Sequence, residues 1–178
     1  MLKAGDGGDV PADVTALRVP VGALAPALPA SLAEQALVDL LDAHTALESL
    51  LDHDGTAGWS HRSVYELVAA YGPWFTPAAL PAQIRPLPER QCFTNAAATE
   101  REHPHLLYTE GFALTAGNAV LHAWCTDTVG HVIDPTWLDP GSAYLGIRLP
   151  PNLRPRAPRN WGVLEAPHSL YPLLRNGL

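Results

Sequence analysis

Leucine recurs at helical spacing over the first well-patterned stretch of the chain, which begins at Ser31. The run Ser31-Leu-Ala-Glu34 has the spacing of a capping box, in which the serine oxygen and the glutamate side chain satisfy free backbone N–H groups. The apolar positions that follow share one helical face: Leu37, Leu40, Leu41, Leu47, Leu50 and Leu51. This pattern predicts an amphipathic helix that ends between residues 52 and 55.

A second helical pattern is shorter and begins near residue 63. Ser63-Val-Tyr-Glu66 fits another capping box, although Ser60 is an alternative N-cap. The apolar face of this pattern consists of Val64, Leu67, Val68 and Tyr71. Gly72-Pro73 then stops the helix. Both helices are expected to cover a hydrophobic core.

A Pro-rich connection over residues 72–90 leads from these helices to Gln91-Cys92. A loop of this length is unusual in a compact domain, and long loops often carry function. The residues from Cys92 to Glu102 suit a third helix, which Pro104 ends. Cys92 is therefore predicted to lie at the first position of a helix.

Segments rich in apolar residues after Pro104 predict three strands separated by turns. They span residues 106–114, 120–126 and 131–134, and Gly117-Asn118 is a hairpin signal between the first two. A helix followed by an antiparallel meander points to an α+β fold.

The length of 178 residues predicts one domain with a sizeable core. Residues 1–30 are rich in Gly, Asp, Ala and Pro and predict a flexible N-terminal arm. Residues 31–178 are expected to form a single domain. Within it we expect a helical part (31–72), a core that carries the candidate chemistry (88–149) and an extended C-terminal segment (150–178).

The net charge and the cysteine count limit the possible partners. The formal charge is -7 with His neutral, and phosphate backbones and anionic lipids repel a protein of that sign. No stretch reaches the length of a membrane span, and the first residues lack the basic and apolar regions of a signal peptide. The two cysteines, Cys92 and Cys125, indicate free thiols in a reducing compartment. We expect a cytoplasmic protein without nucleic-acid or membrane partners, and the sequence leaves its oligomeric state open.

Cys92 has the position of a thiol nucleophile. Free N–H groups and the helix dipole favour a negative charge at the start of a helix. The same N–H groups can hold the oxyanion of a tetrahedral intermediate. Such a cysteine needs a base to complete a catalytic site.

His122 and Asp134 lie on the two strands that flank the second turn. If that turn is centred on residue 128, the two residues are directly opposite, with Cβ atoms about 4.5–5.5 Å apart. The carboxylate would then fix the imidazole and leave its other nitrogen to face Cys92. The same register pairs Cys125 with His131 on the opposite face, so Cys125 is predicted to be a structural cysteine.

The order of these motifs resembles the transglutaminase-like branch of the papain-like cysteine enzymes. It consists of a cysteine at a helix start, a strand bearing His-Ala-Trp from residue 122, and a turn followed by Asp-Pro-Thr from residue 134. The likeness covers roughly residues 87–149 and extends to bacterial and phage members of that superfamily. It implies a papain-like core in which a catalytic helix, preceded here by two helices, packs on an antiparallel sheet. It also implies a triad of Cys92 as nucleophile, His122 as base and Asp134 as orienting residue.

Other residues near the triad are candidates for oxyanion or substrate contacts. Gln91 and Gln83 compete as the side-chain oxyanion donor of papain-like enzymes, with Gln91 preferred, and backbone N–H groups alone are the alternative. Asn95, one helical turn beyond the nucleophile, either lines the cleft or makes a structural hydrogen bond. Trp124 shares the face of the histidine and is predicted to wall the site, a role compatible with core packing. Three residues after the triad are expected to shape a substrate groove: Trp137, Tyr144 and Gly146.

These residues predict a thiol hydrolase or acyltransferase that acts on an amide bond of a peptide, a protein or a small amide. A peptidase or amidase is slightly preferred over a crosslinking enzyme. Phe93, where many family members have Trp, leaves the substrate class open. The alternatives are a non-catalytic binding domain of the same fold and arylamine-type acetyl transfer. Cys, His and Asp can all bind zinc, but no close ligand pair accompanies them, so no metal or other cofactor is predicted.

Overall fold

The computed structural model of the chain describes residues 28–50, 54–153, 162–167 and 171–178. The predicted N-terminal arm lies outside these residues except for its last three. Among the described residues, no helix has the length and apolar character that crossing a bilayer requires.

The two predicted N-terminal helices are confirmed. Helix α1 spans Leu32–Leu50, and its capping box forms as expected, with Ser31 Oγ accepting from the Glu34 N–H at 3.1 Å and Glu34 Oε2 accepting from the Ser31 N–H at 3.1 Å. Helix α2 spans Val64–Tyr71. Its N-cap is Ser63, whose Oγ accepts from the Glu66 N–H, and the helix ends where Gly72 N–H bonds to Val68 O.

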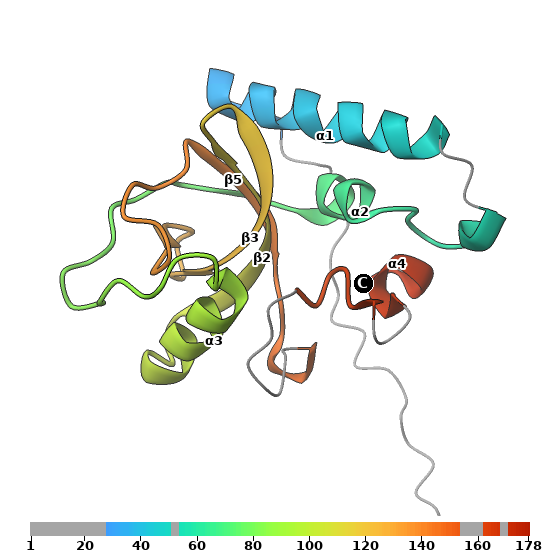
Figure 1. Cartoon of the computed structure of the whole chain (residues 1–178). Helices are drawn as coiled ribbons and strands as arrows, with labels where there is room; N and C mark the ends of the chain where they lie inside the picture. Colours follow the sequence, from blue (N-terminus) through green and yellow to red (C-terminus); the bar gives the residue numbers. More distant parts are fainter. Residues whose placement is uncertain (1–27, 51–53, 154–161, 168–170) are drawn as a thin grey trace, which may run out of the picture.

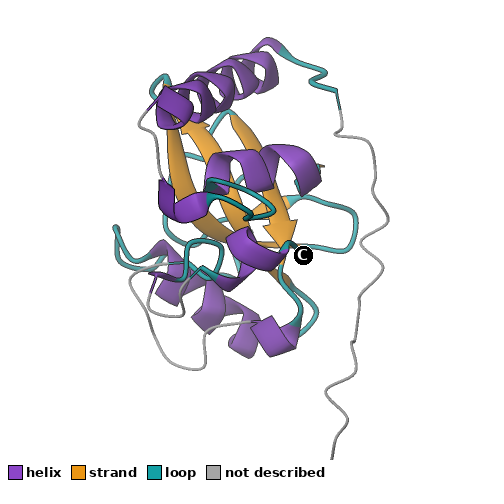
Figure 2. Cartoon of the chain, turned by 90° about the vertical axis from the view of Figure 1, so that its right-hand side faces the viewer, coloured by secondary structure: helices purple, strands orange, loops and turns teal. Residues whose placement is uncertain are grey.

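Helix α3 spans Cys92–Glu102, as the sequence predicts, and a short helix, α4, spans Pro172–Asn176. The helices lie against one face of the sheet, with α1 across its upper end and α3 along its lower part (Figures 1 and 2). The main hydrophobic core fills the space between helices and sheet, and its largest buried side chains include Tyr108, Phe112 and Leu37.

Five antiparallel strands form the sheet, which confirms the α+β class. The strands are β1 (Trp74–Phe75), β2 (Leu107–Thr115), β3 (Asn118–Thr126), β4 (Val132–Ile133) and β5 (Ala143–Arg148), in the order β1-β5-β2-β3-β4. The predicted meander describes β2, β3 and β4 only. Strands β1 and β5 are absent from the sequence prediction, and β5 lies between β1 and β2.

Two glycines allow β5 to pack tightly beside β2. Gly111 and Gly146 are cross-strand partners, and a Cβ on either would collide with the opposite backbone. A Cβ on Gly146 would also lie 2.6 Å from the Trp124 ring, so this glycine leaves room for a large buried indole beneath the site. Gly146 is buried and therefore does not line a groove as predicted.

The C-terminal segment is not extended throughout, because it contains a 3-10 turn at Pro151–Leu153 and helix α4. Its residues 163 and 164 are held by the carboxylate of Glu110, a fully buried residue of β2. Glu110 accepts hydrogen bonds from Val163 N–H at 2.7 Å, from Leu164 N–H at 3.0 Å and from the Tyr108 hydroxyl at 2.6 Å. Burial raises the pKa of Glu110, and these donors offset part of that effect.

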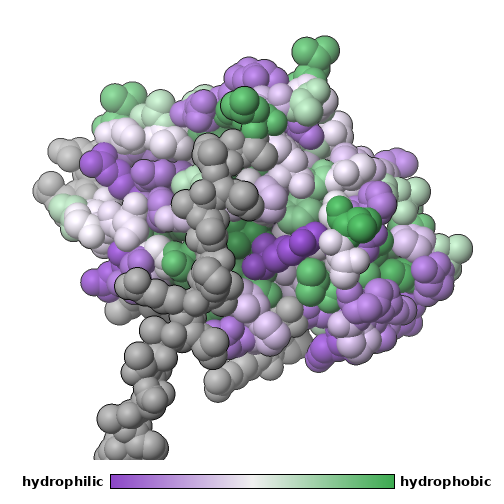
Figure 3. All heavy atoms as spheres, turned by 180° about the vertical axis from the view of Figure 1, so that it is seen from behind, coloured by the Kyte–Doolittle hydropathy of each residue, from purple (hydrophilic) through white to green (hydrophobic). Residues whose placement is uncertain are grey.

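Figure 3 shows the described residues on the back of the molecule. Hydrophilic and hydrophobic residues are interspersed over that face, and the hydrophobic ones form several small groups (Figure 3). Isolated apolar side chains on a surface are common and need no partner.

Candidate active site

Cys92 is the first residue of α3, and its thiol is free and half-buried. The first backbone hydrogen bond of this helix runs from Asn95 N–H to Gln91 O. The N–H groups of Cys92 and Phe93 therefore lie ahead of the helical ladder, at the positive end of the helix dipole. This end can hold an anion close to the sulfur.

The His122 and Asp134 side chains meet as predicted, and His122 Nε2 lies 2.8 Å from Asp134 Oδ2. Each residue is only 2% exposed. An Nε2–H donor to the carboxylate leaves Nδ1 on the opposite side of the ring, and Cys92, which lines the same cleft, contributes to the raised pKa of this histidine. The structure thus brings all three predicted triad residues together.

The predicted strand register is wrong by two residues. Cys125 pairs with Ile133 and Thr126 with Val132, so His122 and Asp134 are diagonal neighbours instead of direct partners. The turn is longer than expected because Asp127 Oδ1 accepts hydrogen bonds from the backbone N–H groups of residues 129–131. A shift of two residues keeps side chains on the same face, so the pair survives the error.

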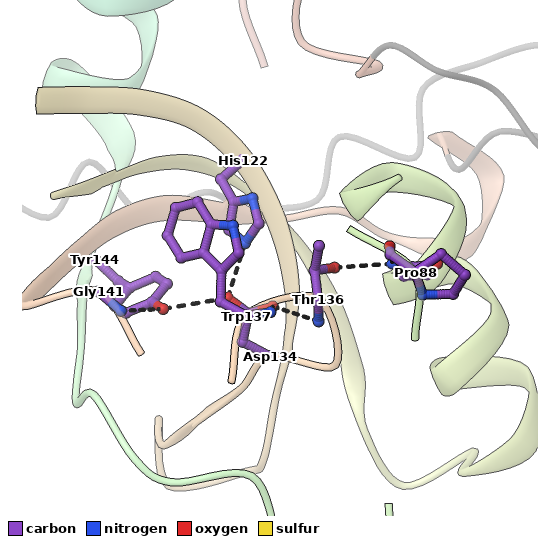
Figure 4. A network of polar contacts seen from close by, with 8 residues as sticks. Pro88, His122, Asp134, Thr136, Trp137, Gly141 and Tyr144 are labelled. Atoms are coloured by element: carbon purple, nitrogen blue, oxygen red, sulfur yellow. Dashed lines mark hydrogen bonds and ion pairs between the residues drawn. The ribbon is translucent and has the colours of Figure 1, made fainter. Parts of the chain in front are cut away.

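Both oxygens of Asp134 accept further hydrogen bonds (Figure 4). Oδ1 accepts from the backbone N–H groups of Thr136 at 2.9 Å and Trp137 at 3.3 Å. Oδ2 accepts from the Tyr144 hydroxyl at 3.2 Å, and Tyr144 in turn accepts from Gly141 N–H at 2.8 Å. Burial and the neighbouring carboxylate raise the pKa of Tyr144, which keeps its hydroxyl as a donor. These contacts hold the carboxylate in one orientation toward the imidazole.

Two tryptophans flank the imidazole of His122. Trp137 stacks on it with ring centroids 3.9 Å apart and an angle of 9° between the planes (Figure 4). Trp124 lies on the same strand face at 6.2 Å and is fully buried, in accord with its predicted place beside the histidine. Its Nε1 has no hydrogen-bond partner among the described residues. The two indoles limit the access of water to the bond between His122 and Asp134.

The electrostatics of the site favour a charged imidazole. Burial alone would lower the pKa of His122, but hydrogen bonds and charge interactions with Asp134 and Cys92 outweigh burial and raise it to about 9. At neutral pH the ring therefore holds its proton, as an imidazolium beside a thiolate would require.

Asn95 is buried and serves as a brace. Its Nδ2 donates to Pro88 O at 2.7 Å and to Thr136 Oγ1 at 3.1 Å. Both amide hydrogens are thereby used within the protein, which favours the structural alternative over a substrate contact. The brace ties the first turn of α3 to the loop that follows Asp134, and so fixes Cys92 relative to Asp134.

The two candidate glutamines differ in their distance from the site. Gln91 is the exposed N-cap of α3, and its side chain makes no capping hydrogen bond. Gln83 lines a separate surface hollow with Arg85 and His103. Gln91 thus stays a candidate for the oxyanion contact, and the structure does not bring Gln83 to the cysteine.

A cleft of about 450 Å³ opens over the thiol and the imidazole. Its walls come from the start of α3, from one end of β3 and from the loop after Asp134, and its lining residues are Glu89, Arg90, Cys92, Phe93, Val120, Leu121, His122, Thr136 and Trp137. The volume lies within the range of small-molecule and peptide sites. Among the described residues, no three His, Cys, Asp or Glu side chains gather as a metal site.

The sequence reasoning missed the contacts of Tyr144 and Thr136. Tyr144 was expected to shape a groove, but it is buried beneath Asp134 because the unpredicted strand β5 carries it there. The signal for Thr136 was present, since Asp-Pro-Thr is a typical sequence for a side chain that accepts backbone N–H groups two and three residues on. Trp137 does line the cleft, as expected.

The chain matches no family model, no curated protein and no solved structure.

Proposed function

We propose that this protein is a thiol-dependent hydrolase or acyltransferase that acts on an amide bond through Cys92, His122 and Asp134. The observation that carries the proposal is the hydrogen bond between the Asp134 carboxylate and the His122 imidazole, in a cleft that this imidazole lines together with the half-buried thiol of Cys92. A papain-like arrangement, with the nucleophile at the start of a helix packed on the sheet that bears the base, belongs to the same proposal.

In the first step the Cys92 thiolate attacks the amide carbonyl carbon, and a carbon–sulfur bond forms as the carbonyl electrons move to oxygen. The protonated His122 then gives its proton to the leaving nitrogen, the carbon–nitrogen bond breaks and an amine departs. An acyl group remains on the sulfur. Water or a second amine attacks this thioester, His122 takes the proton of the attacking group, and the thiolate leaves. Water gives hydrolysis, and an amine gives acyl transfer.

The N–H groups of Cys92 and Phe93 supply the oxyanion contact in this scheme. They precede the helical ladder of α3, and their dipoles need no rearrangement when the oxyanion forms. The exposed amide of Gln91 is the neighbouring side chain that can add a third donor.

Asp134 orients the base and stabilises its charge, because its carboxylate accepts from Nε2 and is itself held by three other donors. Trp137 covers this pair on the side of the cleft. The proton that catalysis needs is therefore stored on a ring that water reaches poorly.

Thiol labelling tests the proposal directly. Chloroacetamide should alkylate Cys92 at pH 6 to 7 at least about tenfold faster than it alkylates glutathione, because a neighbouring imidazolium and the start of a helix stabilise negative charge on the attacking sulfur. Mass spectrometry of the digested protein identifies the labelled residue. His122→Gln should reduce the rate to that of an ordinary thiol, whereas His131→Gln, which alters an exposed histidine paired with Asp127, serves as the matched control.

A rate for the unaltered protein no faster than that of glutathione would overturn the proposal and favour the non-catalytic binding domain. A panel of peptide anilides and acyl-donor amides then separates hydrolysis from transfer, by release of the amine with or without added amine acceptor. Acetyl-CoA turnover with an arylamine tests the remaining alternative.

A further inference from the structure

Among the described residues, no strand pairs with one edge of β3 close to Cys92. Along its length β3 pairs with β2 on one side, but on the other side β4 covers only Cys125 and Thr126. Over residues 118–124 no other described strand lies on that outer edge. Val120, Leu121 and His122 come from this part of the strand and line the cleft. The open edge thus runs along the wall of the candidate active site.

The backbone groups that face outward can be assigned from the pattern of antiparallel pairing. A two-residue hairpin joins β2 to β3 and closes on a hydrogen-bonded pair, so even-numbered residues of β3 bond to β2. Odd-numbered residues bond toward β4, in accord with the bond from Asp127 N–H to His131 O. Ala119 and Leu121 therefore direct their N–H and C=O groups to the open side, where no hydrogen bond joins them to another described residue.

Strand β4 pairs with the last residues of this edge, and the chain then turns away from it. Continuing the register of β3 with β4 would place Pro135 opposite Ala123 and Trp137 opposite Leu121. Pro135 has no N–H with which to extend the ladder. Asp134 Oδ1 then accepts from the next two backbone N–H groups and turns the chain away from the edge. The pairing positions opposite Leu121 and Ala119 are left for another strand.

We infer that an extended peptide segment is the substrate and that it adds to the sheet at these positions. This inference rests on the proposed function, since the edge is relevant to catalysis only if Cys92 is the nucleophile. One residue of the peptide exchanges both backbone hydrogen bonds with Leu121, and the residue two positions away does so with Ala119. The peptide lies one strand spacing, about 4.8 Å, from β3 and brings an amide carbonyl to the sulfur.

Backbone pairing selects substrates by the extended conformation of their backbone more than by their side chains. A small arylamide has too few backbone groups to pair with both edge residues, whereas a peptide offers a matching donor and acceptor at every second residue. A folded strand or helix already uses these groups. The protein should therefore act on flexible segments or chain ends, and tolerate varied side chains in them.

The test compares labelling by acetyl-tetra-alanine chloromethyl ketone with labelling by chloroacetamide. Both alkylate Cys92 with loss of chloride, but only the first can pair with the edge. We expect the peptide reagent to react at least about tenfold faster than the acetyl-alanine analogue with a single residue. N-methylation of one alanine at a time should lower the rate in an alternating pattern, by about three- to tenfold at every second position and little between them.

A variant of the protein tests the same contact from the other side. Ala119→Pro removes an outward N–H without removing a bond of the β2 ladder, and Ala119→Ser keeps that N–H as the matched control. The readout is the ratio of the peptide rate to the chloroacetamide rate, which corrects for any change in the thiol itself. The ratio should fall several-fold for the proline variant and stay within twofold for the serine variant.

The outcomes separate the inference from the proposed function. Fast chloroacetamide labelling together with a peptide rate that is insensitive to length and to N-methylation would overturn edge pairing and leave the triad standing. A drop of equal size at every methylated position would also overturn it, because that pattern indicates steric exclusion. Slow labelling by both reagents would remove the proposed function and, with it, this inference.

Discussion

Trp137 lies parallel to His122, with ring centroids 3.9 Å apart, and it separates the edge of the imidazole that bonds Asp134 from the open cleft. Stacking against an aromatic face also favours a charged ring, by an amount of about 0.5–2 kcal/mol. The indole thus acts on the histidine both as a water shield and as a stabiliser of the imidazolium.

Trp137→Ala should lower the pKa of His122 below about 9, because the stacked ring that favours the imidazolium is lost and water screens its interaction with Asp134. Relief of burial acts in the opposite direction and limits the fall. NMR titration of the imidazole measures this shift. Trp137→Phe keeps a stacked ring and should retain most of the effect. The same pKa of His122 in the alanine variant and in the unaltered protein would show that the indole has no such role.

The two cysteines should differ sharply in reactivity. Cys125 is fully buried and its Sγ donates to Ala96 O at 3.2 Å, whereas Cys92 is half-buried in the cleft. One equivalent of chloroacetamide should therefore label Cys92 alone in the native protein, and Cys92→Ala should abolish fast labelling. Cys125→Ser is the matched control and should label at the native rate. Labelling that divides between the two thiols would contradict this assignment.

Asp134→Asn removes the charge that holds the His122 proton while keeping the size of the side chain. The pKa of His122 should fall, and the second-order rate of thiol labelling at pH 6 should drop by about 100-fold. Asp127→Asn is an informative control, since Asp127 also lies 2.8 Å from a histidine, His131, but on an exposed turn. That variant should leave the labelling rate within twofold of the native value.

Stability should depend on pH through His122. Its pKa in the folded protein is about 9, above the ordinary 6.5, so the folded state binds the proton more tightly. The resulting stabilisation is fully present below about pH 6.5 and is lost as the pH rises through about 9, with an upper bound of about 3 kcal/mol. Urea unfolding of the native protein and of His122→Gln at pH 6 and pH 10 measures it. A difference between them that does not shrink at pH 10 would contradict the assignment.

Glu110 should matter for folding more than for chemistry. Glu110→Ala leaves the N–H groups of Val163 and Leu164 and the Tyr108 hydroxyl without their acceptor and should cost about 3–5 kcal/mol. Because burial raises the pKa of Glu110, the carboxylate makes the protein less stable as the pH rises above the ordinary carboxyl range. Glu110→Gln should remove this slope. Glu102→Gln, on the exposed face of α3, should change the free energy of unfolding by no more than about 0.5 kcal/mol and should leave its pH dependence unaltered.

Local signals predicted the elements that carry the triad. The start of α3 at Cys92, the capping boxes at Ser31 and Ser63 and the pairing of β2 with β3 all depend on residues close in sequence. The hairpin turn was placed one residue late, since Ala116 and Gly117 are the two turn residues with positive φ. Such signals define where an element begins and ends, and they were sufficient to predict the helix that begins at Cys92, the strand that carries His122 and the strand that Asp134 follows.

Long-range partners were beyond the sequence prediction. Strand β1 has only two residues, and the buried run of β5, Ala143–Arg148, lacks the alternation that identifies a half-buried strand. The position of Tyr144 under Asp134 follows from β5 joining β2, which no local pattern indicates. The turn held by Asp127 changed the register through local contacts, because a side chain that accepts three backbone N–H groups can lengthen a turn without altering its composition.

The insertion of β5 between β1 and β2 has a consequence for how the protein is made. The ribosome delivers β2, β3 and β4 before β5, so one long edge of β2 keeps its backbone N–H and C=O groups unpaired until residues 143–148 emerge. During that interval the nascent sheet is a template for association with other chains. A chain interrupted before residue 143 is therefore expected to contain every member of the triad in its sequence and to hold none of them in working geometry.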